Sequence, residues 1–280
     1  MSPAKLARFA DADRYFRCPV CGELLSLDGT SLRCANRHTF DIARQGYVNL
    51  APGARQSAYY DRGSFLARGA ILRAGYYDHI RDAVLEAVGE SGARRVLDAG
   101  CGEGFYARAV QAADPSRDVL AFDISRDCVQ LAAREDTSNA IRWFVGNLAQ
   151  LPLADRSIDC VLDIFSPANH AEFTRVLAPG GLVVKAVPGA RHDIQLREAA
   201  RDQLRHADYA NDDVLAGFAQ GFDVVDRRLV SRTVAMPPED VQSFARMTPL
   251  LFHADLGKVD LAQVHELTIE AEVLIGRVRA

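Results

Sequence analysis

Three cysteines and one histidine near the N-terminus form the clearest metal-binding pattern in the chain. They are spaced as Cys18-x2-Cys21, twelve residues, and then Cys34-x3-His38. Three thiolates and one imidazole complete a tetrahedral shell for Zn²⁺, and a shell filled entirely by protein leaves no position for water or substrate. The spacing therefore predicts a structural zinc ion. Three free thiols beside an unrelated histidine are the alternative.

A second chemical pattern is a glycine-rich turn between Val96 and Phe105. Asp98 ends an apolar run, glycines follow at alternate positions, and a helical stretch begins near Gly104. Such glycines let a ligand approach the backbone, and the helix start offers unpaired N–H groups. The spacing D-x-G-x-G-x-G differs from the G-x-G-x-x-G of dinucleotide sites. Asp123 ends the next apolar run, where a carboxylate can accept hydrogen bonds from ribose hydroxyls. A structural turn or an NAD site remains the alternative for the turn alone.

Strands and helices must position these residues, and the hydrophobic pattern predicts them. Apolar runs alternate with helical stretches, which indicates βαβ units and a parallel sheet. Five parallel strands are expected at 94–100, 119–125, 141–147, 158–166 and 182–188, with helices from about Gly104, from Arg126 and over 171–177. Residues 222–236 and 266–280 resemble an antiparallel pair at the sheet edge, separated by a helix at 238–247. We therefore expect an α/β fold with a mostly parallel, seven-stranded, Rossmann-like sheet.

The chain divides into three parts by composition. Residues 18–40 are rich in turn residues, as expected of a small module held by a ligand, and 46–62 are interpreted as a linker. Residues 64–88 have helical spacing interrupted around Gly75. We expect a zinc-binding module over 1–50, a linker with leading helices over 51–88, and the α/β domain over 89–280.

Composition limits the cellular setting and the partners. The 280 residues are 49% hydrophobic and 25% charged, with no apolar run long enough for a membrane span and no apolar signal core, so a cytoplasmic protein is expected. The net charge of −4 is unevenly spread, because residues 1–73 hold 11 Lys/Arg against 6 Asp/Glu. A polyanion should therefore meet the N-terminal part, although ordinary solvated surface would also explain this excess.

The glycine turn resembles the first motif of class I S-adenosylmethionine-dependent methyltransferases, in which the acid and the turn hold the amino acid part of the cofactor. The resemblance continues in order through Gly146-Asn147-Leu148 with Leu151-Pro152, the segment that usually lies along adenine, and through Arg175–Leu177 with Pro179–Gly181. It implies S-adenosylmethionine as cofactor and methyl transfer as the reaction.

The N-terminal motifs resemble one family, the RlmA-type 23S rRNA (guanine-N1) methyltransferases. Cys-Pro-x-Cys, Cys34-x3-His38-x-Phe40-Asp41 and Gly46–Leu50 carry this resemblance. It continues over nearly the whole chain, through Ala67-Arg68, Ala74–Tyr77, Phe165–Pro167, Pro188–His192 and Met247–Pro249. The resemblance implies methylation of guanine N1 in a 23S rRNA hairpin, gripped jointly by the zinc module and the methyltransferase domain, and in some members macrolide resistance.

The resemblance and the motifs together assign candidate site residues. The expected cofactor-binding residues are Tyr77, Asp98, Gly100, Gly102, Glu103, Gly104, Phe105, Asp123, Ile124, Asn147, Leu148 and His192. The target base is expected beside Phe165, Ser166 and Pro167, with Asp163 as the hypothetical acceptor of the N1 proton, to be tested by Asp163→Asn. Arg33, Arg37, Arg44 and Arg55 are expected phosphate contacts. Simpler alternatives are that Tyr77 packs in the core and that His192 caps a helix.

The chain departs from the family pattern in two places near the expected substrate side. Residues 59–64 read Tyr-Tyr-Asp-Arg-Gly-Ser in place of an acidic patch, and Asp163 stands where the family tends to have a basic residue. These departures keep a small-molecule methyltransferase open as an alternative. A catalytically inactive zinc-containing protein that binds RNA or senses the cofactor is another. The sequence also leaves open whether the chain forms a homodimer.

Overall fold

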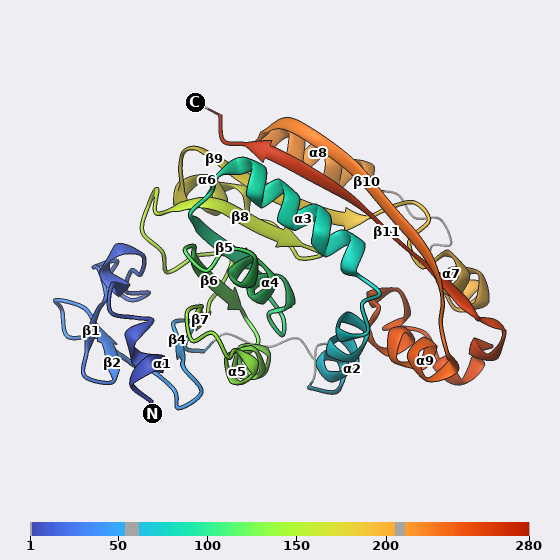
Figure 1. Ribbon diagram of the computed structural model, residues 1–280, viewed down its shortest axis with the longest axis horizontal. Helices are drawn as coiled ribbons and strands as arrows, with labels where there is room; N and C mark the ends of the chain where they lie inside the picture. Colours follow the sequence, from blue (N-terminus) through green and yellow to red (C-terminus); the bar gives the residue numbers. More distant parts are fainter. Residues whose placement is uncertain (1, 54–61, 205–210, 280) are drawn as a thin grey trace.

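The computed structural model describes residues 2–53, 62–204 and 211–279 (Figure 1). The N-terminal part contains helix α1 (Pro3–Ala7), a 3-10 turn (Ala12–Arg14) and a small antiparallel sheet in the order β1-β2-β3. Its strands are β1 (Ser26–Asp28), β2 (Ser31–Arg33) and β3 (Thr39–Asp41). Strand β4 (Tyr47–Asn49) follows and joins the large sheet.

The large sheet runs in the order β10-β11-β9-β8-β5-β6-β7-β4. The five expected parallel strands are present as β5 (Arg95–Ala99), β6 (Asp118–Asp123), β7 (Arg142–Val145), β8 (Ile158–Ile164) and β9 (Leu177–Pro188). Strands β10 (Asp223–Ala235) and β11 (Glu266–Arg277) form the expected antiparallel pair, and β11 also pairs antiparallel with β9. The carboxyl ends of the parallel strands meet at one edge of the sheet, where ligands bind in open α/β folds.

The expected number of seven strands was wrong, because the described part of the chain forms an eight-stranded sheet. The additional strand is β4, which pairs in parallel with β7 within the segment interpreted as a linker. Three residues are too few to show a period of two, so only the partner strand reveals β4 as a strand. The sheet therefore continues into the N-terminal part of the chain.

Helices cover both faces of the sheet (Figure 1). Helices α3 (Asp78–Ser91), α4 (Phe105–Ala113) and α5 (Arg126–Glu135) pack on one face, and α6 (His170–Val176), α8 (Asp212–Gly221) and the N-terminal part pack on the other. Helices α2 (Arg62–Arg73), α7 (Ile194–Ala199) and α9 (Pro238–Met247) share a third apolar cluster with β11. Short 3-10 turns occupy Arg201–Gln203, Pro249–Leu251, Leu256–Lys258 and Leu261–Gln263. No helix within the described ranges has the length and apolar character needed to cross a bilayer.

Buried charges tie the N-terminal part to the segment between α5 and β7. The Arg8 side chain is fully buried and lies 3.4 Å from the carboxylate of Asp136. That carboxylate also accepts a hydrogen bond of 3.0 Å from Nε1 of Trp143, on β7. Removing one partner of a buried pair leaves an uncompensated charge, so this contact fixes the N-terminal helix against the sheet.

Candidate active site and zinc centre

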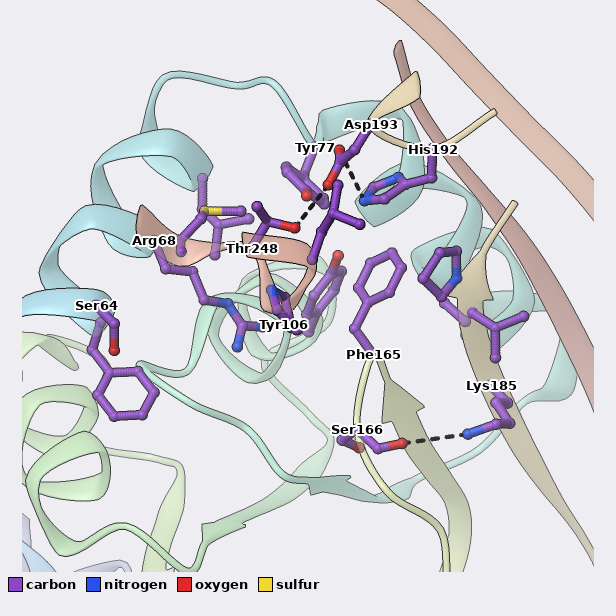
Figure 2. A pocket seen from close by; sticks show the side chains of 18 of the residues that line it. Ser64, Arg68, Tyr77, Tyr106, Phe165, Ser166, Lys185, His192, Asp193 and Thr248 are labelled. Carbon is purple, nitrogen blue, oxygen red and sulfur yellow. Dashed lines mark hydrogen bonds and ion pairs between the residues drawn. The ribbon is translucent and has the colours of Figure 1, made fainter. Parts of the chain in front are cut away.

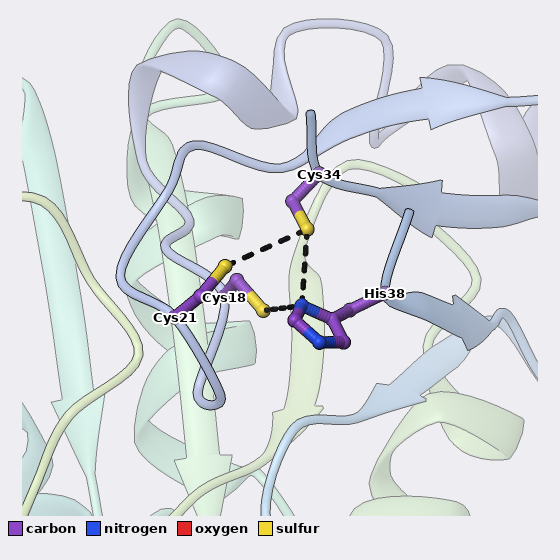
Figure 3. Close-up of side chains that lie close together, drawn as sticks. All are labelled: Cys18, Cys21, Cys34 and His38. Atoms are coloured by element: carbon purple, nitrogen blue, oxygen red, sulfur yellow. Dashed lines mark hydrogen bonds between the residues drawn. The ribbon is translucent and has the colours of Figure 1, made fainter. Parts of the chain in front are cut away.

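The four predicted metal ligands lie together in the N-terminal part (Figure 3). Their ligand atoms are all within 4.8 Å of one another. His38 Nδ1 lies 3.5 Å from the sulfur of Cys18 and 3.4 Å from that of Cys34, and the sulfurs of Cys21 and Cys34 are 3.7 Å apart. Zinc bonds of ~2.0–2.3 Å in a tetrahedron place ligands at roughly these separations. The donor set therefore fits a closed, structural Zn²⁺ site.

The glycine turn joins β5 to α4 with a backbone that only glycine adopts easily. Gly100, Gly102 and Gly104 have φ of 75°, 54° and 81°. A Cβ added at Gly104 would lie 2.4 Å from the ring of Trp143, and one at Gly100 would lie 2.7 Å from Cβ of Ser166. The turn is therefore held between β7 beneath it and the end of β8 beside it.

The two strand-end acids support this turn from inside. Asp98 accepts a hydrogen bond from the amide of Ala107, and Asp123 accepts one from the amide of Gly102, both at 3.0 Å. Burial raises the pKa of Asp98 to about 7, against the opposing hydrogen bond from Ala107. Burial also raises the pKa of Asp123, opposed by the amide donors of Ser125 and Gly102. Both carboxyls lie at the strand ends expected for cofactor contacts.

Glu103 provides the best test of whether S-adenosylmethionine fits the site. Its side chain is buried, and neither carboxylate oxygen has a hydrogen-bond partner among the described residues. Its nearest cation is Arg68 on α2, whose Nε lies 3.8 Å away. A cation at this distance donates no hydrogen bond, so the buried carboxylate still needs a donor. The α-ammonium group of the cofactor's amino acid part has the chemistry that Glu103 needs.

A cavity of about 390 Å³ lies beyond the glycine turn (Figure 2). It is enclosed by α2, by the start of α4, by the ends of β8 and β9 and by the segment after α9. Arg68 and Lys185 lie on opposite sides of it, with the rings of Tyr106 and Phe165 between them. The hydroxyl of Tyr106 is buried and has no hydrogen-bond partner among the described residues. The cavity thus combines aromatic walls with a few polar groups, as small-molecule sites do.

Aromatic rings form the wall of this cavity. Phe165 stacks on His192 with centroids 5.9 Å apart, and Tyr77 meets the edge of Phe165 at 6.0 Å. Phe165 has a φ of 53°, which is uncommon for a residue with a bulky side chain. This local conformation turns the chain sharply after β8. The surrounding structure thus holds an uncommon backbone conformation at a residue that lines the cavity.

The structure separates the predicted site residues into two groups. Lining the cavity are Tyr77, Phe165, Ser166 and His192. Outside it are the glycine turn with Asp98 and Asp123, the exposed Pro167, Ile124 and Asn147, and the partly buried Leu148 and Phe105. His192 accepts a hydrogen bond from the amide of Glu270 and does not cap α7, whose N-cap is Asp193. Tyr77 is buried in the third cluster, as its packing interpretation predicted, and it also lines the cavity, while its contact with the cofactor stays a prediction.

Asp163 is completely buried and is not among the residues lining the cavity. Its carboxylate pairs with Lys185 Nζ at 2.7 Å and accepts a hydrogen bond of 2.6 Å from the hydroxyl of Ser166. Burial raises the pKa of Asp163, and the charge and hydrogen bond of Lys185 oppose that rise. The role of Asp163 as proton acceptor stays a hypothesis, and its observed contacts are with these two residues.

Several cavity residues were missed by the sequence-based assignment. Arg68, Tyr106, Lys185 and Thr248 line the cavity, yet none was named as a site residue. Arg68 belongs to the quoted Ala67-Arg68 motif, which could have indicated it. The signal for Lys185 was a single charge inside the apolar run of residues 182–188. Among the expected phosphate contacts, Arg33 pairs with Asp28, and Arg55 lies outside the described residues. Residues 59–61, part of the first departure from the family pattern, also lie outside them.

Comparisons with known proteins agree with this arrangement. The model described as "RlmA, N-terminal" matches residues 16–57, and one described as "Methyltransferase domain" matches residues 96–181. The Bacillus subtilis (strain 168) protein YxjB, which carries a 23S rRNA (guanine-N(1)-)-methyltransferase name, is 31% identical over 93% of this chain and 96% of its own length. The Streptomyces fradiae 23S rRNA (guanine(748)-N(1))-methyltransferase is 30% identical over 94% of this chain and 97% of its own length.

The chain belongs to the RlmA-type 23S rRNA (guanine-N1) methyltransferase family. It is an S-adenosylmethionine-dependent methyltransferase with an α/β fold and a zinc-binding module, as the sequence predicted. Solved structures share the fold alone. The PH0226 protein from Pyrococcus horikoshii OT3 is 13% identical, with a TM-score of 0.51 over 80% of this chain and 94% of its own. The [4+2]-cyclase SpnF is 19% identical, with a TM-score of 0.50 over 72% of this chain and 82% of its own.

Proposed function

We propose that this chain methylates N1 of a guanine in a 23S rRNA hairpin. The observation that carries the proposal is that relatives named for this reaction match the zinc module and the methyltransferase domain together, over more than nine-tenths of the chain. A small-molecule enzyme that merely shared the methyltransferase domain would not need the N-terminal match. The acidic net charge favours neither an rRNA substrate nor a small-molecule substrate, because the excess of basic residues lies in the N-terminal part.

The cavity is suited to a single base extruded from an RNA hairpin. Enzymes that act on a base take it out of the stack into a pocket and hold it against aromatic side chains. Phe165 and His192 present stacked rings at the end of β8, beside Ser166. A purine ring held there would lie next to the glycine turn, since Ser166 contacts the position of Gly100. This placement supports the assignment of Phe165 and Ser166 to the acceptor side, whereas Pro167 lies outside the cavity.

The cofactor would be held by residues on both sides of the glycine turn. Glu103 and Arg68 would bind the ammonium and carboxylate of its amino acid part, Asp123 the ribose, and Asn147 with Leu148 the adenine. When bound, S-adenosylmethionine supplies an electrophilic methyl group on a sulfonium. The chain's own residues contribute chiefly by aligning the acceptor nitrogen with that group.

Binding of two cofactor analogues, one with and one without the amino acid part, tests the amino acid subsite separately from activity. Arg68→Met should lower the affinity for S-adenosylhomocysteine, measured by calorimetry, by tenfold or more, because a charge-assisted hydrogen bond contributes about 1.5–3 kcal/mol. Methylthioadenosine lacks the amino acid part, so its affinity should not change. Arg73→Met is the matched control, because Arg73 lies on the same helix with a mostly exposed side chain. Equal losses for both ligands would contradict this assignment.

The zinc module is proposed to contact the RNA backbone. Arg37 and Arg44 are exposed on the N-terminal part, where phosphate contacts would position the hairpin without reading its sequence. Binding should therefore weaken steeply with salt, and each lost contact should lower the slope of log K against log salt by about one unit. Salt-independent binding would favour the small-molecule alternative.

A labelling experiment decides between the candidate functions. The protein is incubated with labelled S-adenosylmethionine and 23S rRNA from a strain that lacks this modification, and the label is mapped by mass spectrometry. Label in N1-methylguanine of one hairpin is the expected result. An Asp123→Ala variant, impaired in cofactor binding, is the negative control. Label elsewhere in RNA, or no label in RNA, would overturn the proposal, and binding of both ligands without any turnover would support a sensor.

Three further expectations accompany the proposal. A ribosomal RNA substrate places the protein in the cytoplasm. Homodimer formation is checked by light scattering at several concentrations. A role in macrolide resistance is checked by expressing the chain in a susceptible host and measuring the inhibitory concentration, which should rise only if the methylated guanine lies at the drug site.

A further inference from the structure

Lys185 is a buried lysine in the wall of the cavity. It lies on β9, and its side chain is only 5% exposed while that of its partner Asp163 is fully buried. A buried ion pair is weak evidence for stability, since apolar residues of similar size often stabilise a core as well or better. The pair therefore calls for an explanation in the chemistry of the cavity.

The ammonium group of Lys185 has donor capacity to spare. One N–H faces Asp163 Oδ2 at 2.7 Å and a second faces the backbone oxygen of Ser166 at 3.4 Å. No acceptor for the third N–H occurs among the described residues, and Lys185 lines the cavity beside Ser166 (Figure 2). Ser166 is itself held, because its hydroxyl lies 2.8 Å from the carbonyl oxygen of Ala99 and 2.6 Å from Asp163. The ammonium group of Lys185 is thus held in position by partners that are themselves fixed before a substrate binds.

We propose that Lys185 is a catalytic residue whose ammonium donates a hydrogen bond to the oxygen at position 6 of the acceptor guanine. This inference rests on the proposed function. Asp163 is then a positioning residue, which holds the ammonium at the end of β8. The cavity supports this geometry because Phe165 and His192, which would stack on the base, lie in the same wall.

The hydrogen bond assists loss of the N1 proton. Guanine N1 carries a proton, which passes to water, and the negative charge left behind is shared between N1 and the oxygen at position 6. The ammonium of Lys185 stabilises the charge on that oxygen. The N1 electron pair forms the new bond to the methyl carbon, the carbon–sulfur bond breaks, and its electron pair returns to sulfur. One proton is released and the sulfonium charge disappears, so charge balances.

The same contact discriminates between purines. Adenine carries an amino group at position 6, which is a donor, so the ammonium of Lys185 would face another donor. A site built around a hydrogen bond rejects an analogue that cannot make it, because a buried polar group is left unpaired. Lys185 is therefore also a specificity determinant for guanine over adenine.

Other titratable groups near Lys185 must be separated from its effect. Asp163 lies on β8, and His170 on α6 has a pKa lowered by burial and by the charge of Lys185. On β11 the residue paired in register with Lys185 is the apolar Leu274. The other titratable groups lining the cavity are Arg68, Tyr77, Tyr106, His192, Asp193 and Arg197. Lys185→Met removes the charge that lowers the pKa of His170 and opposes the rise in the pKa of Asp163, whereas Lys185→Arg keeps a charge there, so the pH profiles of these two variants are compared.

The test compares Lys185→Met with the wild type on the hypomethylated rRNA. At pH 7 the turnover number should fall by about 10²–10³, the usual effect of removing a donor to a developing oxyanion. S-adenosylhomocysteine affinity should stay within about twofold, because Lys185 does not hold the cofactor. The deficit should shrink as pH rises, since N1 then loses its proton without help. Lys258→Met is the matched control, because Lys258 is well exposed, and it should leave the rate unchanged.

The outcomes separate this inference from the proposed function. If the wild type labels no guanine N1, the proposed function fails and the inference fails with it. If the wild type labels guanine N1 and Lys185→Met loses the same factor at every pH, or none, only the inference is overturned. Should Lys185→Met lose cofactor binding through misfolding, Lys185→Arg decides. This variant keeps a charged donor and should retain the wild-type pH profile, and a profile displaced to higher pH would refute the role.

Discussion

Gly104 offers the sharpest test of how the cofactor turn is built. In Gly104→Ala the new Cβ would lie 2.4 Å from Cη2 of Trp143 and 3.1 Å from Cβ of Ala132. The Trp143 ring cannot move aside freely, because it is fully buried and its Nε1 is bonded to Asp136. The substitution therefore combines backbone strain with overpacking at one position.

The expected loss follows from these two terms. A left-handed conformation costs an alanine ~1–2 kcal/mol, and the φ of 81° lies in that region. Overpacking a core adds ~1–3 kcal/mol. Gly104→Ala should therefore lower the free energy of unfolding by about 2–5 kcal/mol, a large part of the ~5–15 kcal/mol typical of a folded protein. The assay is equilibrium unfolding in urea with zinc present and no cofactor, so that lost ligand binding does not contribute.

A control and a second substitution make the test decisive. Gly89→Ala is the control, because Gly89 lies inside α3 with no atom within 4 Å of an added Cβ, and it should stabilise the protein by about 0.5–1 kcal/mol. Trp143→Phe removes the colliding ring atoms, so the further loss from Gly104→Ala in that background should shrink to the strain term. A loss below about 1 kcal/mol for Gly104→Ala alone would refute the reasoning.

Three other perturbations have expected outcomes. Removing zinc with a chelator, or Cys34→Ser, should accelerate amide hydrogen exchange in β1–β3, since a closed metal site contributes folding free energy; unchanged exchange would contradict a structural role. Asp98→Asn should stabilise the cofactor-free protein at pH 8 but hardly at pH 4. Burial raises the pKa of Asp98 from 3.8 to about 7, so the folded state holds a proton that the unfolded state releases, and stability falls as pH rises through this window. At pH 8 the free energy of unfolding of Asp98→Asn in urea should exceed that of the wild type by about 4 kcal/mol. A difference that does not depend on pH would exclude the raised pKa of Asp98 as its cause. Arg8→Met should cost about 3–5 kcal/mol, because Asp136 would be left buried and unpaired, whereas the exposed Arg14→Met should cost less than about 0.5 kcal/mol.

Features encoded by neighbouring residues were predictable from the sequence. The zinc ligands come in two short pairs, so their spacing indicated a metal site, and the continuous glycine turn indicated the cofactor once its resemblance to the methyltransferase motif was included. Helix α9 was expected at 238–247 and occupies Pro238–Met247, because the proline starts it and its apolar face has helical spacing. Local sequence thus determined the zinc set, the cofactor turn and the main strands, whereas the order of the strands in the sheet came from the tertiary structure.

Features that join distant residues were decided only by tertiary structure. β4 is too short to show a period, and its partner β7 lies almost a hundred residues later. Arg68 meets Glu103, and Lys185 meets Asp163, through the packing of α2 and of adjacent strands. No local pattern predicts such pairs, because they form only when packing brings distant residues together, and their free energy depends on burial and on the loss of water. The sequence by itself determined a zinc-binding methyltransferase, and the tertiary structure decided which charges line the cavity.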